Sequence, residues 1–281
     1  MIVPFTEVVG RAQAGRRAVG AFTVYGIETA VGVLAAAERR GSDVIILVSA
    51  EAFRSRLGRP LVDATRALCE QSTARCCLQL DHATQLDLVS AGFGAGFGAI
   101  MVDGSRLSFG DNVELVQAAT EIGLRHGGHI EAELGRVEGD EDSSSLADVG
   151  LLTDPDAAGR FMTLTGAACL AVSIGNVHGS YRMAPVLDFE RLARVAQSVS
   201  QPLSLHGGSG VPPTVLRDAI TMGISKINVN TELRRSYFAA LNEHMAELQP
   251  GAQLLRMGQL VSQRIEDTVY GKLVEFDPAL R

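Results

Sequence analysis

The amino-acid sequence predicts an α/β protein folded as a (β/α)8 TIM barrel. Short apolar runs rich in β-branched residues alternate with longer amphipathic segments of helical period, and the alternation occurs eight times along the chain. A length of 281 residues with 46% hydrophobic residues suits one barrel of this kind. No linker or change in composition divides the chain, so a single domain over residues 1–281 is expected.

The eight apolar runs are the predicted strands. They cover residues 18–24, 44–49, 76–81, 99–103, 129–133, 169–174, 202–206 and 224–229. Amphipathic segments that favour helices lie at 27–40, 61–72, 112–125, 156–165, 188–198 and 213–222. Two further helical segments, 232–248 and 253–270, are expected to be the last barrel helix and a C-terminal helical addition. Because helices separate consecutive strands, the strands should be parallel.

Charge and composition exclude several classes of partner. The chain has 25 basic and 32 acidic residues, a net charge of −7 and no basic block, which argues against nucleic-acid binding. No basic segment precedes an apolar run near the start, and no uncharged stretch reaches membrane-spanning length. A soluble, cytoplasmic protein without a membrane partner is therefore expected. Four cysteines without CxxC spacing are interpreted as reduced core residues.

Two glycine-rich stretches have different expected roles. The stretch 92–98 (GFGAGFG) precedes a strand, so its glycines are expected to end a helix and turn the chain into the fourth strand. The stretch 206–210 (HGGSG) leaves the seventh strand and leads into a helix. Barrel enzymes build phosphate sites from such loops and helix N-termini, so phosphate binding is favoured there over a plain turn.

Polar residues follow the predicted strands at the end where barrel enzymes carry their chemistry. Three of the six histidines in the chain lie at three of these exits. The residues at the exits of strands two to eight are Ser49, Asp81 with His82, Asp103, Glu133, His178, His206 and Asn228.

Three imidazoles at one barrel mouth suit a catalytic zinc ion, with His82, His178 and His206 as ligands. The alternative is that each is an isolated loop histidine. The remaining histidines, His126, His129 and His244, are interpreted as structural. One difficulty is local: neighbouring residues on an extended strand point to opposite faces, so a turn beginning at Asp81 is needed to bring both it and His82 to the mouth.

Seven motifs in order resemble the class II fructose-bisphosphate and tagatose-bisphosphate aldolases. They are AFTVYGIET, LQLDHAT, MVDGSRLSF, IEAELGRV with EGDED, SIGNVHGSY, LSLHGGSG and KINVNTEL, and they span nearly the whole chain. The resemblance implies a zinc-dependent (β/α)8 lyase of the compact subgroup, a homodimer or homotetramer, that cleaves a sugar phosphate to dihydroxyacetone phosphate and an aldehyde.

Residue roles follow from the same resemblance. It makes His82, His178 and His206 the zinc ligands and Glu133 a nearby carboxylate that binds or orients the metal. Asp81 corresponds to the acid that protonates the aldehyde oxygen, and Glu141 to the carboxylate that transfers protons at dihydroxyacetone phosphate. A monovalent cation, Na⁺ or K⁺, often supports the phosphate in this family. The implied phosphate contacts are Gly179, Gly207, Ser209, Asn228 and Thr231. Asn230 is a further implied substrate contact, and Ser49, at the exit of the second strand, is a candidate one.

The sequence also departs from the family pattern. Thr23 replaces the usual asparagine of the first motif, Glu138 replaces the first glycine before the acidic loop, and GNVHG replaces the commoner GTxHG. Asn230 occupies the position that faces the hydroxyls of the aldehyde half, where fructose-type enzymes tend to carry Asp or Asn. Fructose bisphosphate is therefore the favoured substrate, with tagatose bisphosphate or another keto-sugar phosphate as the alternative.

Two other functions remain open from the residues. A zinc hydrolase of the amidohydrolase type would carry an HxH pair on its first strand, and the first strand here ends AFTVYG. A non-catalytic relative would not need Asp81 together with the three histidines. Schiff-base chemistry is not expected, because Lys226, the only lysine before Lys272, lies early in the eighth strand and away from the mouth.

Overall fold

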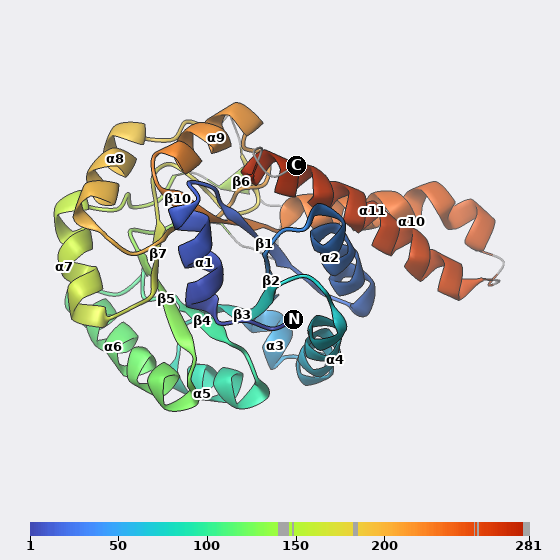
Figure 1. The fold of residues 1–281 in the computed structure, drawn as a ribbon, viewed down its shortest axis with the longest axis horizontal. Coiled ribbons are helices and arrows are strands. Elements are labelled where there is room, and N and C mark those ends of the chain that lie inside the picture. Colours follow the sequence, from blue (N-terminus) through green and yellow to red (C-terminus); the bar gives the residue numbers. More distant parts are fainter. Residues whose placement is uncertain (140–145, 148, 182–184, 250, 252, 278–281) are drawn as a thin grey trace.

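The computed structural model describes residues 1–139, 146–147, 149–181, 185–249, 251 and 253–277. Eight parallel strands close into a barrel in the order β1-β10-β9-β7-β5-β4-β3-β2 (Figure 1). The predicted barrel is therefore confirmed, with strand ends within about two residues of the expected ones. The strands are β1 (Val19–Thr23), β2 (Val44–Ser49), β3 (Cys76–Ala83), β4 (Ala99–Val102), β5 (His129–Leu134), β7 (Cys169–Val172), β9 (Leu203–Leu205) and β10 (Ile224–Val229).

Helices surround the strands, and their order agrees with the predicted alternation (Figure 1). They are α2 (Ile27–Arg40), α3 (Ala50–Arg54), α4 (Gly58–Gln71), α5 (Leu86–Ala95), α6 (Phe109–His126), α7 (Pro155–Thr165), α8 (Phe189–Ser198), α9 (Pro213–Thr221), α10 (Thr231–Leu248) and α11 (Leu254–Phe276). The expected role of the first glycine-rich stretch is confirmed, because Gly96 ends α5 with a positive φ of 98°. Within the described residues, no helix combines the length and the apolar character needed to cross a membrane.

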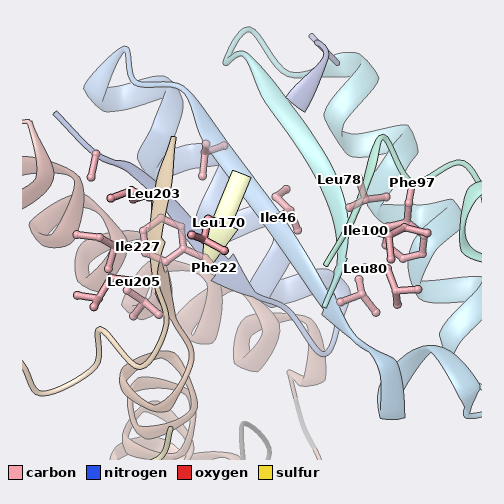
Figure 2. Packing of buried hydrophobic residues seen from close by; sticks show 14 of the residues in the cluster. Phe22, Ile46, Leu78, Leu80, Phe97, Ile100, Leu170, Leu203, Leu205 and Ile227 are labelled. Atoms are coloured by element: carbon pink, nitrogen blue, oxygen red, sulfur yellow. The ribbon is translucent and has the colours of Figure 1, made fainter. Parts of the chain in front are cut away.

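The outer faces of the strands form the main core against the helices. Figure 2 shows Phe22, Ile46, Leu78 and Leu170 among the side chains of this layer, all of them buried. Alternate strand residues point the other way, into the barrel. The four cysteines are buried and free, as expected for reduced core residues.

An N-terminal helix, α1 (Phe5–Ala14), was not predicted from the sequence. It lies across the ring of strands in Figure 1. Its apolar residues, including Phe5 and Val9, form a separate cluster with Val19, Cys77 and Cys169 near the beginnings of the strands. The helix therefore closes the N-terminal end of the barrel and leaves the C-terminal end for the polar residues.

The C-terminal addition is helical, as predicted, and α10 and α11 project together beyond the barrel (Figure 1). Helix α11 packs closely on α2, where a Cβ added at Gly32 would lie 2.6 Å from the carbonyl oxygen of Ser262. Glycine permits this approach. A short parallel pair, β6 (Leu146–Ala147) and β8 (Ser180–Tyr181), lies outside the barrel and was also not predicted. One domain over residues 1–281 stays a prediction.

Candidate metal centre

Three histidine side chains meet at the C-terminal mouth of the barrel. His82 lies at the end of β3, while His178 and His206 follow β7 and β9. Nδ1 of His206 lies 3.2 Å from Nε2 of His82 and 3.5 Å from Nε2 of His178. His178 and His206 are buried and His82 is nearly so. The three strand exits that carry histidine thus converge on one point.

One backbone angle brings Asp81 and His82 to the same mouth. His82 has a φ of 55°, in the left-handed region that residues other than glycine seldom adopt, and the register of β3 with β4 shifts between Leu80 and Ala83. Asp81 then reaches Asn228, whose Nδ2 lies 3.3 Å from Asp81 Oδ2. The turn that the sequence requires here is present as this irregularity.

The arrangement fits a divalent metal. Tetrahedral zinc with Zn–N distances of about 2.0–2.1 Å spaces its nitrogen ligands about 3.3 Å apart, which matches the 3.2 and 3.5 Å between these imidazole nitrogens. Two buried carboxylate oxygens, Asp81 Oδ1 and Glu133 Oε2, have no hydrogen-bond partner among the described residues. Buried oxygens in that state are expected where a metal or substrate supplies the missing partner.

A carboxylate orients His82 from behind. Nδ1 of His82 lies 3.1 Å from Oδ2 of Asp103, and the other oxygen of Asp103 accepts hydrogen bonds from the backbone and hydroxyl of Ser105. Burial opposes the charged form of Asp103, but the hydrogen bond and charge of His82 and the donors of Ser105 outweigh it, so the Asp103 pKa falls below its usual range. His82 thus has its Nε2 available toward the other imidazoles.

A second carboxylate holds His206. Nε2 of His206 lies 2.9 Å from Oε1 of Glu131, and Nζ of Lys226 lies 2.9 Å from Oε2 of the same carboxylate. All three side chains are fully buried. Burial lowers the pKa of His206, against the opposing hydrogen bond with Glu131. A neutral imidazole is the form that binds metals.

Glu133 is the one carboxyl here whose pKa rises. Burial, reinforced by the charge of Asp103, raises the pKa of Glu133 to about 7 in the metal-free protein. Its Oε1 accepts a hydrogen bond from the backbone N–H of Val137 at 3.0 Å. A second cluster with metal-binding spacing contains His82, Asp103 and Glu133, so Glu133 lies close to the candidate ligand His82.

A cavity of about 240 Å³ is bordered by His82 and His178. Two arginines border it, and Glu138 joins them: its carboxylate contacts Arg136 and lies 3.5 Å from Arg106. The Glu138 carbonyl oxygen also accepts a 2.8 Å hydrogen bond from the backbone of His178. The residue that departs from the family pattern therefore ties the start of the acidic loop to the histidine site. The described lining is Ser49, Ala50, Glu51, His82, Asp103, Ser105, Arg106, Arg136, Val137, Gly139 and His178.

Four of the predicted contacts come together beside this mouth. The hydroxyl of Thr231 donates to the carbonyl oxygen of Gly179 at 3.3 Å, and the Ser209 hydroxyl accepts from the N–H of Glu232 at 3.3 Å. Helix α10 begins at Thr231, so the N–H groups of its first turn lie at the junction of the two loops. Gly207, with a φ of 64°, lies in the same junction, because a Cβ there would meet the carbonyl oxygen of Val177 at 2.0 Å.

Three other predicted contacts have different surroundings. The side chain of Asn228 faces Asp81 and the Glu131–Lys226 pair, and its Oδ1 accepts from Lys226 Nζ at 2.5 Å. The amide of Asn230 contacts the Tyr25 hydroxyl, with its oxygen at 3.0 Å and its nitrogen at 2.8 Å. Ser49 borders the cavity and caps α3 by accepting from the N–H of Ala52. Glu141 lies outside the described residues.

Sequence reasoning gave no role to Glu131, Gln79 or Lys226, which lie beneath the histidines. A period-two signal was available, because each stands two residues before a polar residue at its strand exit: Glu131 before Glu133, Gln79 before Asp81 and Lys226 before Asn228. Such pairs share one face of a strand. The expectation that Lys226 lies away from the mouth agrees with its full burial beneath it.

Fold and site together define a (β/α)8 barrel with a candidate three-histidine metal centre and acidic groups around it. The chain matches the family model described as fructose-bisphosphate aldolase class-II over residues 3–278. It belongs to the class II fructose-bisphosphate aldolase family, and is thus a carbon–carbon lyase. Of the functions left open, aldolase is the one supported, in place of a zinc hydrolase or a non-catalytic relative.

Individual proteins of similar sequence or structure match nearly the whole length of this chain. A probable fructose-bisphosphate aldolase of Bacillus subtilis is 34% identical over 98% of this chain and 97% of its own length. The YdjI aldolase of Escherichia coli K12 superposes with a TM-score of 0.86 at 28% identity, covering 98% of this chain and 97% of that one. A putative fructose-1,6-bisphosphate aldolase of Coccidioides immitis superposes with a TM-score of 0.90 at 29% identity, covering 97% and 96%.

Proposed function

We propose that this protein is a zinc-dependent aldolase that interconverts a ketose bisphosphate, with fructose bisphosphate favoured, and dihydroxyacetone phosphate plus an aldehyde. Within the family established above, one observation carries the proposal. His82, His178 and His206 meet with their ring nitrogens 3.2 to 3.5 Å apart, beside the buried carboxylate of Asp81. Both the ligand type and the spacing suit catalytic zinc.

The protein residues have separate tasks in this mechanism. When bound, zinc would act as a Lewis acid toward the ketone oxygen of the substrate. In cleavage, Asp81 takes the proton of the C4 hydroxyl as the C3–C4 bond breaks, and in condensation it returns that proton to the aldehyde oxygen. The bonding electrons stay on the dihydroxyacetone phosphate half. Glu141 delivers a proton to the carbon that was C3 of the ketose. Glu133 binds or orients the metal.

Phosphate binding is assigned to the junction of the loops after β7 and β9 with the start of α10. Gly179, Gly207, Ser209 and Thr231 are the proposed contacts, supported by the hydrogen bonds that join them. Asn230 is assigned to the aldehyde half. Ser49, which borders the cavity, is assigned to the substrate, and so is Asn228, whose side chain faces Asp81 in place of the phosphate role that the resemblance implies. A monovalent cation, Na⁺ or K⁺, beside the phosphate belongs to the same proposal.

The proposed assembly is a homodimer or homotetramer in the cytoplasm. Large apolar side chains are exposed on α2 and α11, including Ile27 at 54%, Leu254 at 84% and Leu255 at 78%. Exposed apolar side chains gathered on one surface support an interface between subunits. Four free cysteines support a reducing compartment.

Metal content and aldolase activity measured on the same preparations test this function. We expect about one zinc per chain in the wild type, cleavage of fructose bisphosphate, and loss of both in His206→Ala. His244→Ala is the control, because His244 lies on α10 away from the cavity and should leave both unchanged. Undiminished zinc and activity in His206→Ala would remove the metal assignment. An aldehyde screen in the condensation direction then identifies the natural acceptor.

A further inference from the structure

We infer that Glu131 and Lys226 form a buried positioning pair that fixes which nitrogen of His206 faces the metal. The inference rests on the proposed metal-binding role of His206. It assigns a task to two charged residues that neither touch the substrate cavity nor serve as metal ligands. Both lie one layer deeper in the barrel than Asp81 and the three histidines.

The contacts of the Glu131 carboxylate are fully specified. Oε1 lies 2.9 Å from Nε2 of His206 and 3.2 Å from Nζ of Lys226, while Oε2 lies 2.9 Å from the same Nζ and 2.7 Å from Nε2 of Gln79. Lys226 also donates to Ser204 at 3.4 Å and to Asn228 at 2.5 Å. Glu131, Lys226, Gln79 and His206 are all fully buried. Water therefore cannot replace any of these partners, and each contact constrains the others.

These contacts determine the tautomer of His206. A carboxylate oxygen only accepts hydrogen bonds, so Nε2 of His206 carries the hydrogen and a neutral ring leaves its lone pair on Nδ1. Nδ1 is the atom that faces Nε2 of His82 and of His178. Glu131 therefore directs the metal-binding lone pair toward the other two ligands, as carboxylates behind metal-bound histidines generally do.

Without the carboxylate, the neighbouring groups favour the opposite tautomer. Nδ2 of Asn228, a hydrogen-bond donor, lies 3.3 Å from Nε2 of His206, and Lys226 holds that amide in place through its oxygen. In Glu131→Gln, Lys226 and Gln79 retain the side-chain oxygen at the Oε2 position, so the new NH2 group faces His206. The new NH2 group then requires a lone pair on Nε2, which places the hydrogen on Nδ1, between the imidazoles.

A merely structural ion pair and a positioning pair respond differently to substitution. Either Glu131→Gln or Lys226→Met leaves one uncompensated buried charge, whereas the double variant removes both charges. Thermal stability should therefore fall in each single variant and recover in the double variant. Zinc affinity should not recover, because the double variant still lacks the carboxylate behind His206.

The experiment measures zinc affinity by competition with a chromophoric chelator, alongside the melting temperature of each metal-free protein. We expect Glu131→Gln and Glu131→Gln/Lys226→Met to bind zinc about 10- to 100-fold more weakly than the wild type. Cys169→Ala is the matched control, since Cys169 is buried and pairs in register with Glu131. It should lower the melting temperature and leave zinc affinity unchanged.

Nitrogen NMR of labelled histidines in the metal-free proteins provides a second readout. The hydrogen of His206 should be on Nε2 in the wild type and on Nδ1 in Glu131→Gln, which retains Lys226. Wild-type zinc affinity in the double variant, or an unchanged tautomer in Glu131→Gln, would overturn the positioning role and leave a structural ion pair. A wild type that binds no zinc would instead refute the proposed function itself, so the two failures are distinguishable.

Discussion

At the scale of single residues, the backbone angle of His82 decides the composition of the site. With φ at 55°, consecutive side chains of β3 both reach the mouth, where a regular strand would have sent one of them into the helix layer. Left-handed geometry in a residue with a Cβ costs about 1–2 kcal/mol. A strained residue that is also a candidate metal ligand is consistent with a strain retained for function.

Substitution of Asp81 and of Glu141, the two proposed proton-transfer residues, should impair different reactions. Asp81→Ala should lower the rate of fructose bisphosphate cleavage by about 10²- to 10⁴-fold, yet still exchange the transferable C–H proton of dihydroxyacetone phosphate with solvent. Glu141→Ala should lose both reactions, because its assigned proton belongs to that half of the substrate. Proton NMR in deuterated buffer measures the exchange. Exchange abolished in Asp81→Ala but normal in Glu141→Ala would reverse the two roles.

Substrate stereochemistry should depend on Asn230. The amide is buried against the Tyr25 hydroxyl, which orients it, and an amide left unpaired by an epimeric hydroxyl costs about 1–3 kcal/mol. We expect the wild type to prefer fructose over tagatose bisphosphate and Asn230→Ala to reduce that preference about tenfold. Tyr25→Phe should reduce it less. Steady-state kcat/KM for both sugars measures it, and a ratio unmoved by Asn230→Ala would exclude Asn230 as the specificity residue.

Glu133 should make the stability of the metal-free protein depend on pH. Its pKa rises from 4.5 to about 7 because burial disfavours the charge. The folded state thus holds a proton that the unfolded state releases, so the contribution is complete below about pH 4.5 and lost as pH rises to about 7. The loss is about 3 kcal/mol.

Glu133→Gln, which stays neutral, is the reference for this prediction. In chelator, the melting temperature of the wild type relative to Glu133→Gln should fall between about pH 5 and pH 7. Added zinc, which favours the carboxylate, should reduce the difference. If the melting temperatures of the two proteins change with pH in the same way across this range, Glu133 does not titrate there.

At the scale of strands and loops, the alternation of side chains explains both the apolar and the polar interior. Val19, Cys77 and Cys169 near the strand beginnings pack on α1, whereas Glu131 and Lys226 further along support the mouth. The same period of two applies throughout. The inward-facing residues are thus apolar at the N-terminal end of the barrel, which α1 covers, and polar toward the C-terminal end, which carries the candidate site.

Contact between the loops after β7 and β9 should limit substitution at Gly207. Gly207→Ala places a Cβ 2.0 Å from the carbonyl oxygen of Val177, so the loop carrying His178 must move. Gly127→Ala is the matched control, because its φ of 67° is nearly the same and nothing lies within 4 Å of its added Cβ.

Both substitutions lower the free energy of unfolding, because alanine is disfavoured at a positive φ. Gly207→Ala should lower it by about 1–3 kcal/mol more than Gly127→Ala does. Zinc affinity should fall only in Gly207→Ala. Denaturant unfolding and chelator competition measure the two effects. Equal destabilisation in both variants would mean that the contact with Val177 relaxes freely.

At the scale of the whole molecule, α10 and α11 extend beyond the barrel (Figure 1). Both helices present exposed apolar side chains. If this surface joins subunits, Leu254→Glu/Leu255→Glu should shift the wild-type dimer or tetramer toward monomer, because burying a charged carboxylate in an apolar interface is costly. Leu124→Glu is the control, since Leu124 is 72% exposed on α6. Sedimentation velocity measures the assembly, and a double variant that assembles like the wild type would place the interface elsewhere.

The sequence by itself determined the barrel and the histidine set. Eight apolar runs in alternation with helices leave a closed parallel barrel as the architecture that buries them, and strand exits of such a barrel meet at one end. Local periodicity carries this information, so it is readable without contacts. The chain's membership of the aldolase family agrees with the order of its motifs.

Only the tertiary structure decided which polar groups support that site. Glu131 and Lys226 are 95 residues apart, and their meeting depends on barrel closure, which no local pattern encodes. Contacts between residues far apart in the chain also decide three other features. They are the direction of Asn228 toward Asp81, the position of α1 and the left-handed backbone angle of His82. Local propensity selects the elements, but contacts between residues far apart in the chain select the side-chain partners, because burial leaves each polar group only the partners that the closed barrel provides.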